Sequence, residues 1–363
     1  MAKVRSSNIE VLRIFCILII ILNHLSLHGG LVFDYPMQPN AVANMFMHFG
    51  GKLGVDTFII ISGYFLSTAD RFRWDRLVKV FAEATFYGLC FGIFGVFMND
   101  YNFYQVWRIT WNVPYAQWYF ITDYIVMFCL SPFMNKFMKA SSIKEHLGTL
   151  IAMTVMFVLF PTFGDADFDS TSLIFFLYLY LLGGFIRRVE EKIPGTSKQW
   201  MLTLVGGILF IWLVEYLMLV LFAVTEEPYF YQHSQTIRQM QSVVIVFLSI
   251  AAFLGFKRWN LPNYKWINTL ASTSLGVYML HDNYSTRPWM WNNLFHIPDW
   301  SDSPALVPYA LFVMVAIFAM GCAIDLLRQY GLEKPFMKAL EKPLARWETW
   351  FNQKTQALAD KLS

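Results

Sequence analysis

Residues 8–28 read NIEVLRIFCILIIILNHLSLH, an apolar run long enough to cross a lipid bilayer as a helix. Arg13 and His24 interrupt this run, eleven residues apart. At about 100° and 1.5 Å per residue, the spacing puts both side chains within roughly 20° of one helix face, about 16 Å apart along the axis. Glu10, one turn before Arg13, shares that face. Because charged side chains are costly in lipid, we predict that this polar face is turned toward protein or water.

The remaining sequence indicates that this helix is one of many membrane spans. The chain has 363 residues, of which 56% are hydrophobic and 15% charged. This composition is typical of polytopic membrane proteins and excludes an ordinary soluble globular domain. We predict an all-α membrane protein with about ten transmembrane helices. Their predicted positions are residues 9–28, 45–68, 77–98, 117–135, 147–163, 172–187, 200–224, 241–257, 267–283 and 305–327.

The basic residues predict the orientation of these spans. Lys and Arg are concentrated in alternate loops and at both ends of the chain, from Lys3 and Arg5 onward. The opposite loops hold only Arg108, Arg238 and Arg287. By the positive-inside rule, both termini are predicted to be cytoplasmic.

The sequence after the last predicted span has a different character. Residues 328–363 are amphipathic and rich in charge, and they are too few for a second catalytic domain. We divide the chain into a transmembrane domain at residues 1–327 and a cytoplasmic tail at residues 328–363, which we expect to lie on the membrane surface as a helix.

The cysteines predict neither a disulfide framework nor a metal site. All four, at positions 16, 90, 129 and 322, lie within apolar runs and lack the spacing of metal ligands. We therefore expect no bound metal.

Aromatic, amide and acidic residues are enriched in the predicted outer loops, at residues 34–44, 99–117, 164–171, 225–240 and 284–303. Trp118 and Tyr119, with Asp123, open the fourth span in the same way. Such aromatic residues serve as anchors at the membrane interface. They are equally suited to bind sugars, whose faces stack on aromatic rings and whose hydroxyls bond to amides, and the sequence leaves both interpretations open.

The second span carries a line of polar residues. His48, Lys52 and Asp56 follow one another at four-residue spacing, and Lys52 and Asp56 could neutralise each other. The run GVDTF at residues 54–58 leads into Ser-Gly-Tyr at residues 62–64. A Ser-Gly pair in an apolar helix is typical of close helix packing. A serine nucleophile is disfavoured here, because the sequence is not the G-x-S-x-G elbow.

Two further segments carry candidate functional residues. Arg71, Arg73 and Arg76 alternate with aromatic residues after the second span. They are either ordinary cytoplasmic charges or a site for the phosphates and adenine of a nucleotide-bearing donor, although the chain has no Gly-rich phosphate loop. Near the end of the ninth span, His281 and Asp282 lie at the outer face, where they are either interfacial residues or part of a site.

Taken in order, these motifs resemble the acyltransferase 3 family of integral-membrane O-acyltransferases. The resemblance lies in Arg13 and His24 with ten residues between them, in GVDTF followed by Ser-Gly-Tyr, and in the arginines after it. It also includes the segment from Leu275 to His281, which is similar to the family's Gly-x-Tyr-x-x-His ending. The agreement extends over essentially the whole chain, including ten predicted spans with a cytoplasmic N-terminus.

The resemblance implies an enzyme that moves an acyl group from cytoplasmic acyl-CoA, commonly acetyl-CoA, to a hydroxyl of an extracytoplasmic glycan, polysaccharide or lipid-linked saccharide. It implies a multi-pass protein of the plasma or inner membrane, with acyl-CoA as a cosubstrate and no permanently bound cofactor. Polysaccharide-assembly proteins are conceivable partners, and nucleic acid is not expected. We expect no attached SGNH hydrolase-like domain, which some members carry, and the predicted outer loops match no known acceptor-specific motif.

On this basis we predict a role for each candidate residue. His24 acts as general base, and Arg13, paired with Glu10, positions the thioester. The CoA phosphates are held by Arg71, Arg73 and Arg76. The predicted substrate contacts are Ser62, Tyr64, Trp118, Tyr119 and His281.

Other functions fit the same residues. A proton-coupled transporter of a glycan precursor could use Arg13, His24, Lys52 and Asp56 as a relay. A non-enzymatic component of a polysaccharide assembly is a third interpretation. Within the enzyme interpretation, a covalent acyl-enzyme on His24 or Ser62 is left open.

Overall fold

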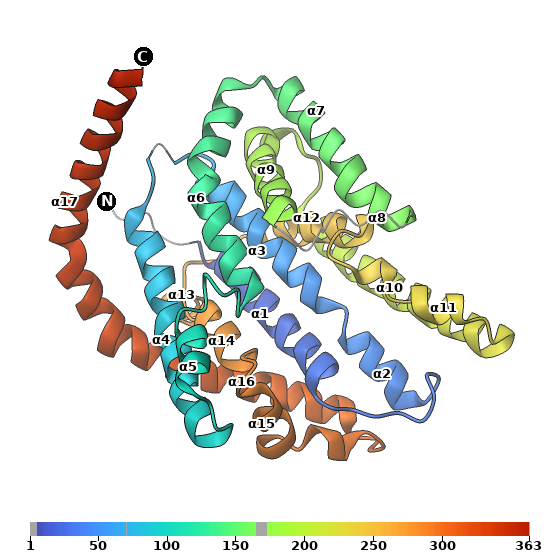
Figure 1. The fold of residues 1–363 in the computed structure, drawn as a ribbon. Coiled ribbons are helices and arrows are strands. Elements are labelled where there is room, and N and C mark those ends of the chain that lie inside the picture. Colours follow the sequence, from blue (N-terminus) through green and yellow to red (C-terminus); the bar gives the residue numbers. More distant parts are fainter. Residues whose placement is uncertain (1–5, 70, 165–172, 363) are drawn as a thin grey trace.

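The structure is a computed structural model that describes residues 6–69, 71–164 and 173–362. The described residues form helices joined by turns and loops, with no strand among them, as Figure 1 shows. The predicted all-α class is therefore confirmed. Lys3, Arg5 and most of the predicted outer loop at 164–171 lie outside the described residues.

Long helices alternate with short ones along the chain. The helices with twelve or more residues are α1 (Ser7–His28), α3 (Gly50–Leu66), α4 (Trp74–Met98), α6 (Tyr119–Ala140), α7 (Ile143–Thr154), α9 (Leu173–Val189), α10 (Ser197–Thr225), α12 (Val243–Lys257), α16 (Leu306–Arg328) and α17 (Lys334–Leu362). The shorter helices are α2 (Pro39–Met47), α5 (Phe103–Thr110), α8 (Phe160–Phe163), α11 (Pro228–His233), α13 (Lys265–Ala271), α14 (Ser274–His281) and α15 (Arg287–Trp289). Single turns of 3₁₀ or π-helix lie at Val155–Leu159, Glu190–Lys192, Thr236–Arg238, Met290–Leu294, Ile297–Trp300 and Gln329–Glu333.

The described residues include seven helical segments that are long and apolar enough to cross a membrane. They are Ser7–His28, Pro39–Leu66, Trp74–Met98, Ile143–Phe163, Ser197–Thr225, Pro228–Lys257 and Leu306–Lys361. A multi-pass membrane protein is therefore supported, whereas the count of ten and the cytoplasmic termini stay predictions. The predicted spans outside this set correspond to α6, α9 and the pair α13 and α14.

The predicted ninth span is a broken helix. It divides into α13 and α14 at a run of three hydroxyl residues, 272–274. Ser272, Thr273 and Ser274 each donate a side-chain hydrogen bond to the backbone oxygen three residues earlier, at 2.7 to 2.9 Å. Such local bonds compete with helical ones. Broken backbone at membrane depth is tolerated where it lines a cavity, and Ser272 and Ser274 do line one.

Helices α1 and α3 form the centre of the bundle. Helix α3 packs against α1, α9 and α12, while α1 also contacts α13, α14 and α16. Glycines allow the closest crossings, because a Cβ on Gly63 would overlap the backbone of Tyr180 in α9. On the side of α3 that meets α1, a Cβ on Gly51 would overlap the side chain of Asn23. The close-packing interpretation of the Ser-Gly pair is thus confirmed.

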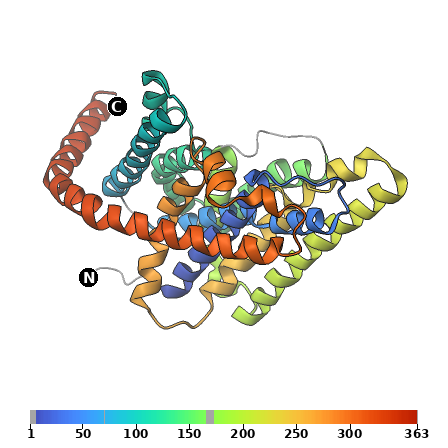
Figure 2. The same ribbon diagram turned by 90° about the horizontal axis from the view of Figure 1, so that it is seen from below.

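The C-terminal helix extends away from the bundle. Figures 1 and 2 show α17 as a long curved arm that continues from α16. It touches α4 through Trp74, whose ring lies 4.3 Å from that of Trp347 and 5.3 Å from that of Phe351. The helical tail is therefore present, and its position on the membrane surface stays a prediction.

Candidate functional site

Two histidines from distant parts of the chain meet inside the bundle. Nδ1 of His24, on α1, lies 2.9 Å from Nε2 of His281, the last residue of α14. The other nitrogen of His281, Nδ1, lies 2.7 Å from the backbone oxygen of Val277. Because a carbonyl oxygen only accepts hydrogen bonds, Nδ1 of His281 carries a proton, and Nε2 of the neutral ring is an acceptor.

This hydrogen-bond network fixes the tautomer of His24. Since Nε2 of His281 accepts, Nδ1 of His24 donates, and Nε2 of His24 keeps its lone pair. No described residue forms a hydrogen bond with that Nε2. The arrangement therefore presents a basic nitrogen whose orientation is set by the ring behind it.

A carboxylate lies beside the free nitrogen. Oδ2 of Asp282 is 3.8 Å from Nε2 of His24, too far for a hydrogen bond but near enough to stabilise a positive charge on the ring. Oδ1 of Asp282 accepts a bond from Arg287 at 3.1 Å, and the same Nη1 of Arg287 lies 2.9 Å from Nε2 of His28. The indole N–H of Trp118 donates to the backbone oxygen of Asp282 at 3.0 Å.

A cavity of about 420 Å³, which we call the outer cavity, is lined by His24. Trp118 and Tyr119 also line it, as does Lys52, whose ammonium nitrogen lies 5.4 Å from the centroid of the Tyr119 ring. His281 does not line it and is fully buried. His281 therefore contacts His24 directly, and its predicted contact with substrate stays a prediction.

A second cavity of about 200 Å³, the inner cavity, is lined by Arg13, Ser62, Ser272 and Ser274. Ile20, Val55 and Tyr278 line both cavities. The two spaces therefore lie on either side of one layer of side chains. Arg13 and His24, predicted to share a face of α1, thus line two adjacent cavities.

Arg13 has unfilled hydrogen-bonding capacity. Its Nη1 lies 3.9 Å from Oε2 of Glu10, which confirms the predicted pairing at the outer limit of an ion pair. The Nε of Arg13 and the Oε2 of Glu10 are both buried without a hydrogen-bond partner. About a third of the Arg13 side chain, 32%, is exposed. Its guanidinium can therefore bind a further acceptor in the inner cavity.

The two remaining predicted residues of α3 lie in different surroundings. Ser62 lines the inner cavity, but its hydroxyl donates to the backbone oxygen of Phe58 at 3.0 Å, and no histidine contacts it. This bond gives no support to a serine nucleophile. Tyr64 lines neither cavity, and its hydroxyl donates to Glu190 instead. We therefore do not include Tyr64 among the substrate contacts.

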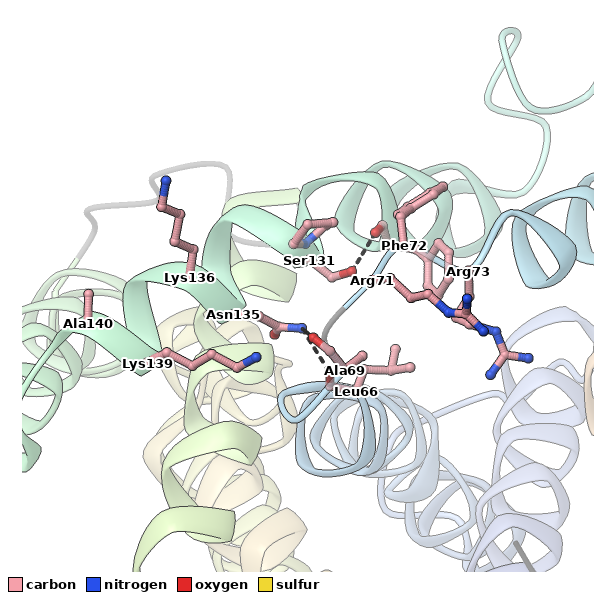
Figure 3. A pocket seen from close by; sticks show the side chains of 12 residues that line it. Leu66, Ala69, Arg71, Phe72, Arg73, Ser131, Asn135, Lys136, Lys139 and Ala140 are labelled. Atoms are coloured by element: carbon pink, nitrogen blue, oxygen red, sulfur yellow. Dashed lines mark hydrogen bonds between the residues drawn. The ribbon is translucent and has the colours of Figure 1, made fainter. Parts of the chain in front are cut away.

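Basic residues gather in a third cavity, of about 530 Å³, which we call the basic pocket. Arg71 and Arg73 line it on one side and Lys136 and Lys139 of α6 on the other, as Figure 3 shows. In that view Lys139 extends toward the loop that carries Ala69, whereas Lys136 points away from it. Asn135 donates to the backbone of this loop, at 2.9 Å to the oxygen of Leu66, and so fixes the pocket wall. The arrangement can hold phosphate groups.

The predicted arginine cluster is therefore only partly assembled. Arg73 donates two hydrogen bonds to Asp75, at 2.9 and 2.7 Å, which raise the pKa of its guanidinium and occupy part of it. Arg76 does not line the pocket but lies one turn before Val80, a residue of the inner-cavity wall. The basic pocket and the inner cavity share no lining residue. On α6, however, Tyr124 lines the inner cavity and Phe128, one turn on, lines the pocket.

Several site residues were not predicted. His28 and Arg287 join the network around Asp282 through contacts between residues far apart in sequence. For Lys136 and Lys139 of α6, which line the basic pocket, the sequence predicts only ordinary cytoplasmic charges. The Ser272 to Ser274 run was the one local signal, since three hydroxyl residues within an apolar stretch favour a helix break.

Within the described part of the chain, no group of three His, Cys, Asp or Glu side chains is arranged to hold a metal ion.

Comparisons with known proteins give the family. A family model described as an acyltransferase domain, acyltransferase 3, matches residues 6–326. No curated protein and no solved structure matches the chain. The matched residues run from before α1 through most of α16 and include both histidines, Arg13 and all three cavities. The chain therefore belongs to the acyltransferase 3 family.

Proposed function

We propose that this protein is a membrane O-acyltransferase that moves an acyl group, acetyl in the first instance, from cytoplasmic acyl-CoA to a hydroxyl of a glycan outside the cell membrane. The family supports the acyl transfer. The observation that carries the proposal is the unpartnered Nε2 of His24, which belongs to a ring that lines the outer cavity and is held from behind by His281. A general base needs such a lone pair within reach of a substrate hydroxyl.

The proposal includes ten passes through the plasma or inner membrane, with both termini in the cytoplasm. Seven candidate spans support it directly, and α6, α9 and the pair α13 and α14 supply the others. The distribution of Lys and Arg favours this orientation. It puts Arg13 and the basic pocket toward the cytoplasm and His24 toward the outside.

The donor then approaches from the cytoplasm. The phosphates of acyl-CoA bind in the basic pocket, among the cations that line it, Arg71, Arg73, Lys136 and Lys139, with Arg76 nearby. The pantetheine arm passes along α6 into the inner cavity, where Arg13 binds its amide or thioester oxygens. The thioester reaches the layer formed by Ile20, Val55 and Tyr278, next to His24. This route needs side-chain movement, because the pocket and the inner cavity have no lining residue in common.

The reaction is a direct transfer. Nε2 of His24 takes the proton of the acceptor hydroxyl while the hydroxyl oxygen attacks the thioester carbon. A carbon–oxygen bond forms, the carbon–sulfur bond breaks, and the departing CoA thiolate receives the proton from Nε2. Asp282 stabilises the imidazolium between the two proton transfers, and the bond to His281 holds the ring in place. General-base catalysis of this kind typically contributes about 10²- to 10⁴-fold in rate.

The acceptor binds in the outer cavity. Trp118 and Tyr119 provide aromatic surface beside His24, as the sugar-binding interpretation of these residues requires. A glycan, a polysaccharide under assembly or a lipid-linked saccharide can each present a hydroxyl there.

The test is acyl transfer by the full chain in membranes. Membrane vesicles containing the protein are incubated with radiolabelled acetyl-CoA, and label in extracted glycans is compared with vesicles that lack it. Mass spectrometry of the same glycans then identifies the group and its position. Label that depends on the protein supports the proposal, whereas transport of a saccharide without consumption of acetyl-CoA would establish a transporter instead.

A further inference from the structure

The wall of the outer cavity carries more positive than negative charge. Its cationic side chains are Lys52, Arg238 and Arg287, and its one carboxylate is Asp282. The cations come from three separate elements, α3, η3 (Thr236–Arg238) and α15. Charges at this depth are expensive, so each is expected to have a partner. The partners found inside the protein show which charge is left over.

Both arginines are paired within the protein. Arg238 lies 2.9 Å from Oε1 of Glu215 on α10, and this pair is almost completely buried, at 7% and 0% side-chain exposure. Arg287 lies 3.1 Å from Oδ1 of Asp282. Each arginine therefore has its own carboxylate, and neither leaves a full charge for a ligand.

Lys52 has no such partner. No carboxylate of the described residues lies within 4.0 Å of its ammonium nitrogen. The ammonium lies over the face of the Tyr119 ring, 5.4 Å from the ring centroid. By its spacing, Asp56, one turn further on, could neutralise it. Instead Asp56 is fully buried, and both of its carboxylate oxygens lack a hydrogen-bond partner. The direct ion pair that the spacing of Lys52 and Asp56 allows is therefore not formed, and the charge of Lys52 acts on the Asp56 carboxylate only from a longer distance.

Lys52 lies at the level of the candidate base. Gly51, its neighbour in α3, packs against Asn23, the neighbour of His24 in α1. Lys52 and His24 line the same cavity. A ligand that presents a hydroxyl to His24 can therefore place an anionic group near the ammonium of Lys52.

We propose that the acceptor is an anionic saccharide, and that its negatively charged group pairs with Lys52 while its hydroxyl faces His24. This inference rests on the proposed function and adds the chemical class of the acceptor. The anionic group is a carboxylate, as in a uronic acid, or a phosphate ester, since both supply oxygen acceptors to an ammonium. Tyr119 completes the contact by packing a ring against the lysine and the sugar.

The first arm of the test identifies the charge of the product. Membranes containing the unmodified protein are incubated with radiolabelled acetyl-CoA, and the labelled glycans are separated by anion exchange. Label is expected in the retained, anionic fraction. Reduction of carboxyl groups abolishes retention if the charge is a carboxylate, whereas treatment with hydrofluoric acid abolishes it if the charge is a phosphate.

The second arm tests Lys52 itself. The anionic fraction, stripped of its acyl groups, serves as acceptor for protein reconstituted in liposomes. We expect Lys52→Gln to reduce transfer about tenfold or more at low acceptor concentration, because a charged contact is lost, and Lys52→Arg to retain most of it. The KM for acetyl-CoA should not change. Arg108→Gln is the matched control, since Arg108 is a cation of the predicted outer surface that does not line the cavity.

The outcomes separate the two proposals. Label in the unretained, neutral fraction overturns the inference and leaves the acyltransferase function standing. Label in the anionic fraction with equal acceptor KM for Lys52→Gln and the unmodified protein also overturns it. No label from acetyl-CoA in any glycan overturns the proposed function, and the inference falls with it.

Discussion

Arg13 and His24 stand on the same helix but line different cavities, and the two cavities meet at a layer formed by Ile20, Val55 and Tyr278. One end of α1 therefore carries a cationic hydrogen-bond donor, Arg13, and the other end carries a base, His24. The guanidinium has free bonding capacity toward the inner cavity, and the imidazole has a free lone pair beside the outer one. In the proposed reaction the donor uses the first and the acceptor uses the second.

The bond between His24 and His281 predicts that His281 positions the base without touching the substrate. His281→Leu removes the acceptor for Nδ1 of His24, so that the ring loses its fixed tautomer, and kcat should fall by about 10²-fold or more. His281→Gln offers a carbonyl oxygen to the same N–H and should recover part of the activity. Steady-state kinetics in liposomes separate this role from substrate binding, since the KM for either substrate should be nearly constant. A large increase in KM with unchanged kcat would argue against it.

Arg13 is predicted to act on the donor. Removing its guanidinium takes away a charged hydrogen-bond donor from the inner cavity, so Arg13→Gln should lower kcat/KM for acetyl-CoA by about 10²-fold. Because Arg13→Gln alone leaves Glu10 buried without its cation, the double variant with Glu10→Gln separates lost catalysis from lost stability. The double variant should fold as well as the unmodified protein in thermal unfolding and be equally inactive. Normal kcat/KM for acetyl-CoA in that variant would remove Arg13 from the donor site.

The basic pocket predicts a salt-sensitive donor affinity. Neutralising Arg71 and Arg73 together as Gln should raise the KM for acetyl-CoA by about tenfold or more, because two charged contacts to phosphate are lost. The KM of the unmodified protein should also rise with ionic strength more steeply than that of the variant. Lys198→Gln, at an exposed lysine that lines none of these cavities, is the control. Identical donor KM values for the variant and the control would mean that CoA binds elsewhere.

The crossing of α3 and α9 predicts a stability effect. Gly63→Ala puts a Cβ into the backbone of Tyr180 and should lower the free energy of unfolding by roughly 1–3 kcal/mol. Gly148→Ala is the matched control, because no atom lies within 4 Å of a Cβ at that position of α7, and it should be neutral or stabilising by up to about 1 kcal/mol. Thermal unfolding in detergent compares the two. Equal midpoints would show that the helices are not in close contact at Gly63.

Local sequence signals predicted most of the helices and the two ends of the site. The apolar runs identified the long helices, and the spacing of Arg13 and His24 put them on one face of α1, because both depend only on helical periodicity. The break at Ser272 to Ser274 was missed, since the apolar residues on either side read as one span. Hydrophobicity alone does not register hydroxyl groups that bond to their own backbone.

The contacts between distant segments could not be predicted. Nothing in the spacing of His281 indicates that it bonds to His24, or that Arg287 reaches Asp282 and His28. The same reason explains why an ion pair that the spacing allows is not formed. Lys52 and Asp56 have the spacing of an ion pair on one helix, but the tertiary structure turns the lysine to a cavity and buries the acid. Nor does the sequence around Tyr64 indicate that its hydroxyl contacts Glu190 across the fold.

The central claim is that Nε2 of His24 removes the proton from the acceptor hydroxyl. The most direct measurement is the initial rate of transfer from radiolabelled acetyl-CoA to glycan by the His24→Gln variant in liposomes, with acetyl-CoA binding measured on the same preparation. The account predicts that transfer falls by about 10²- to 10⁴-fold while the affinity for acetyl-CoA changes little. Transfer at the rate of the unmodified protein, from a variant that binds the donor normally, would contradict it.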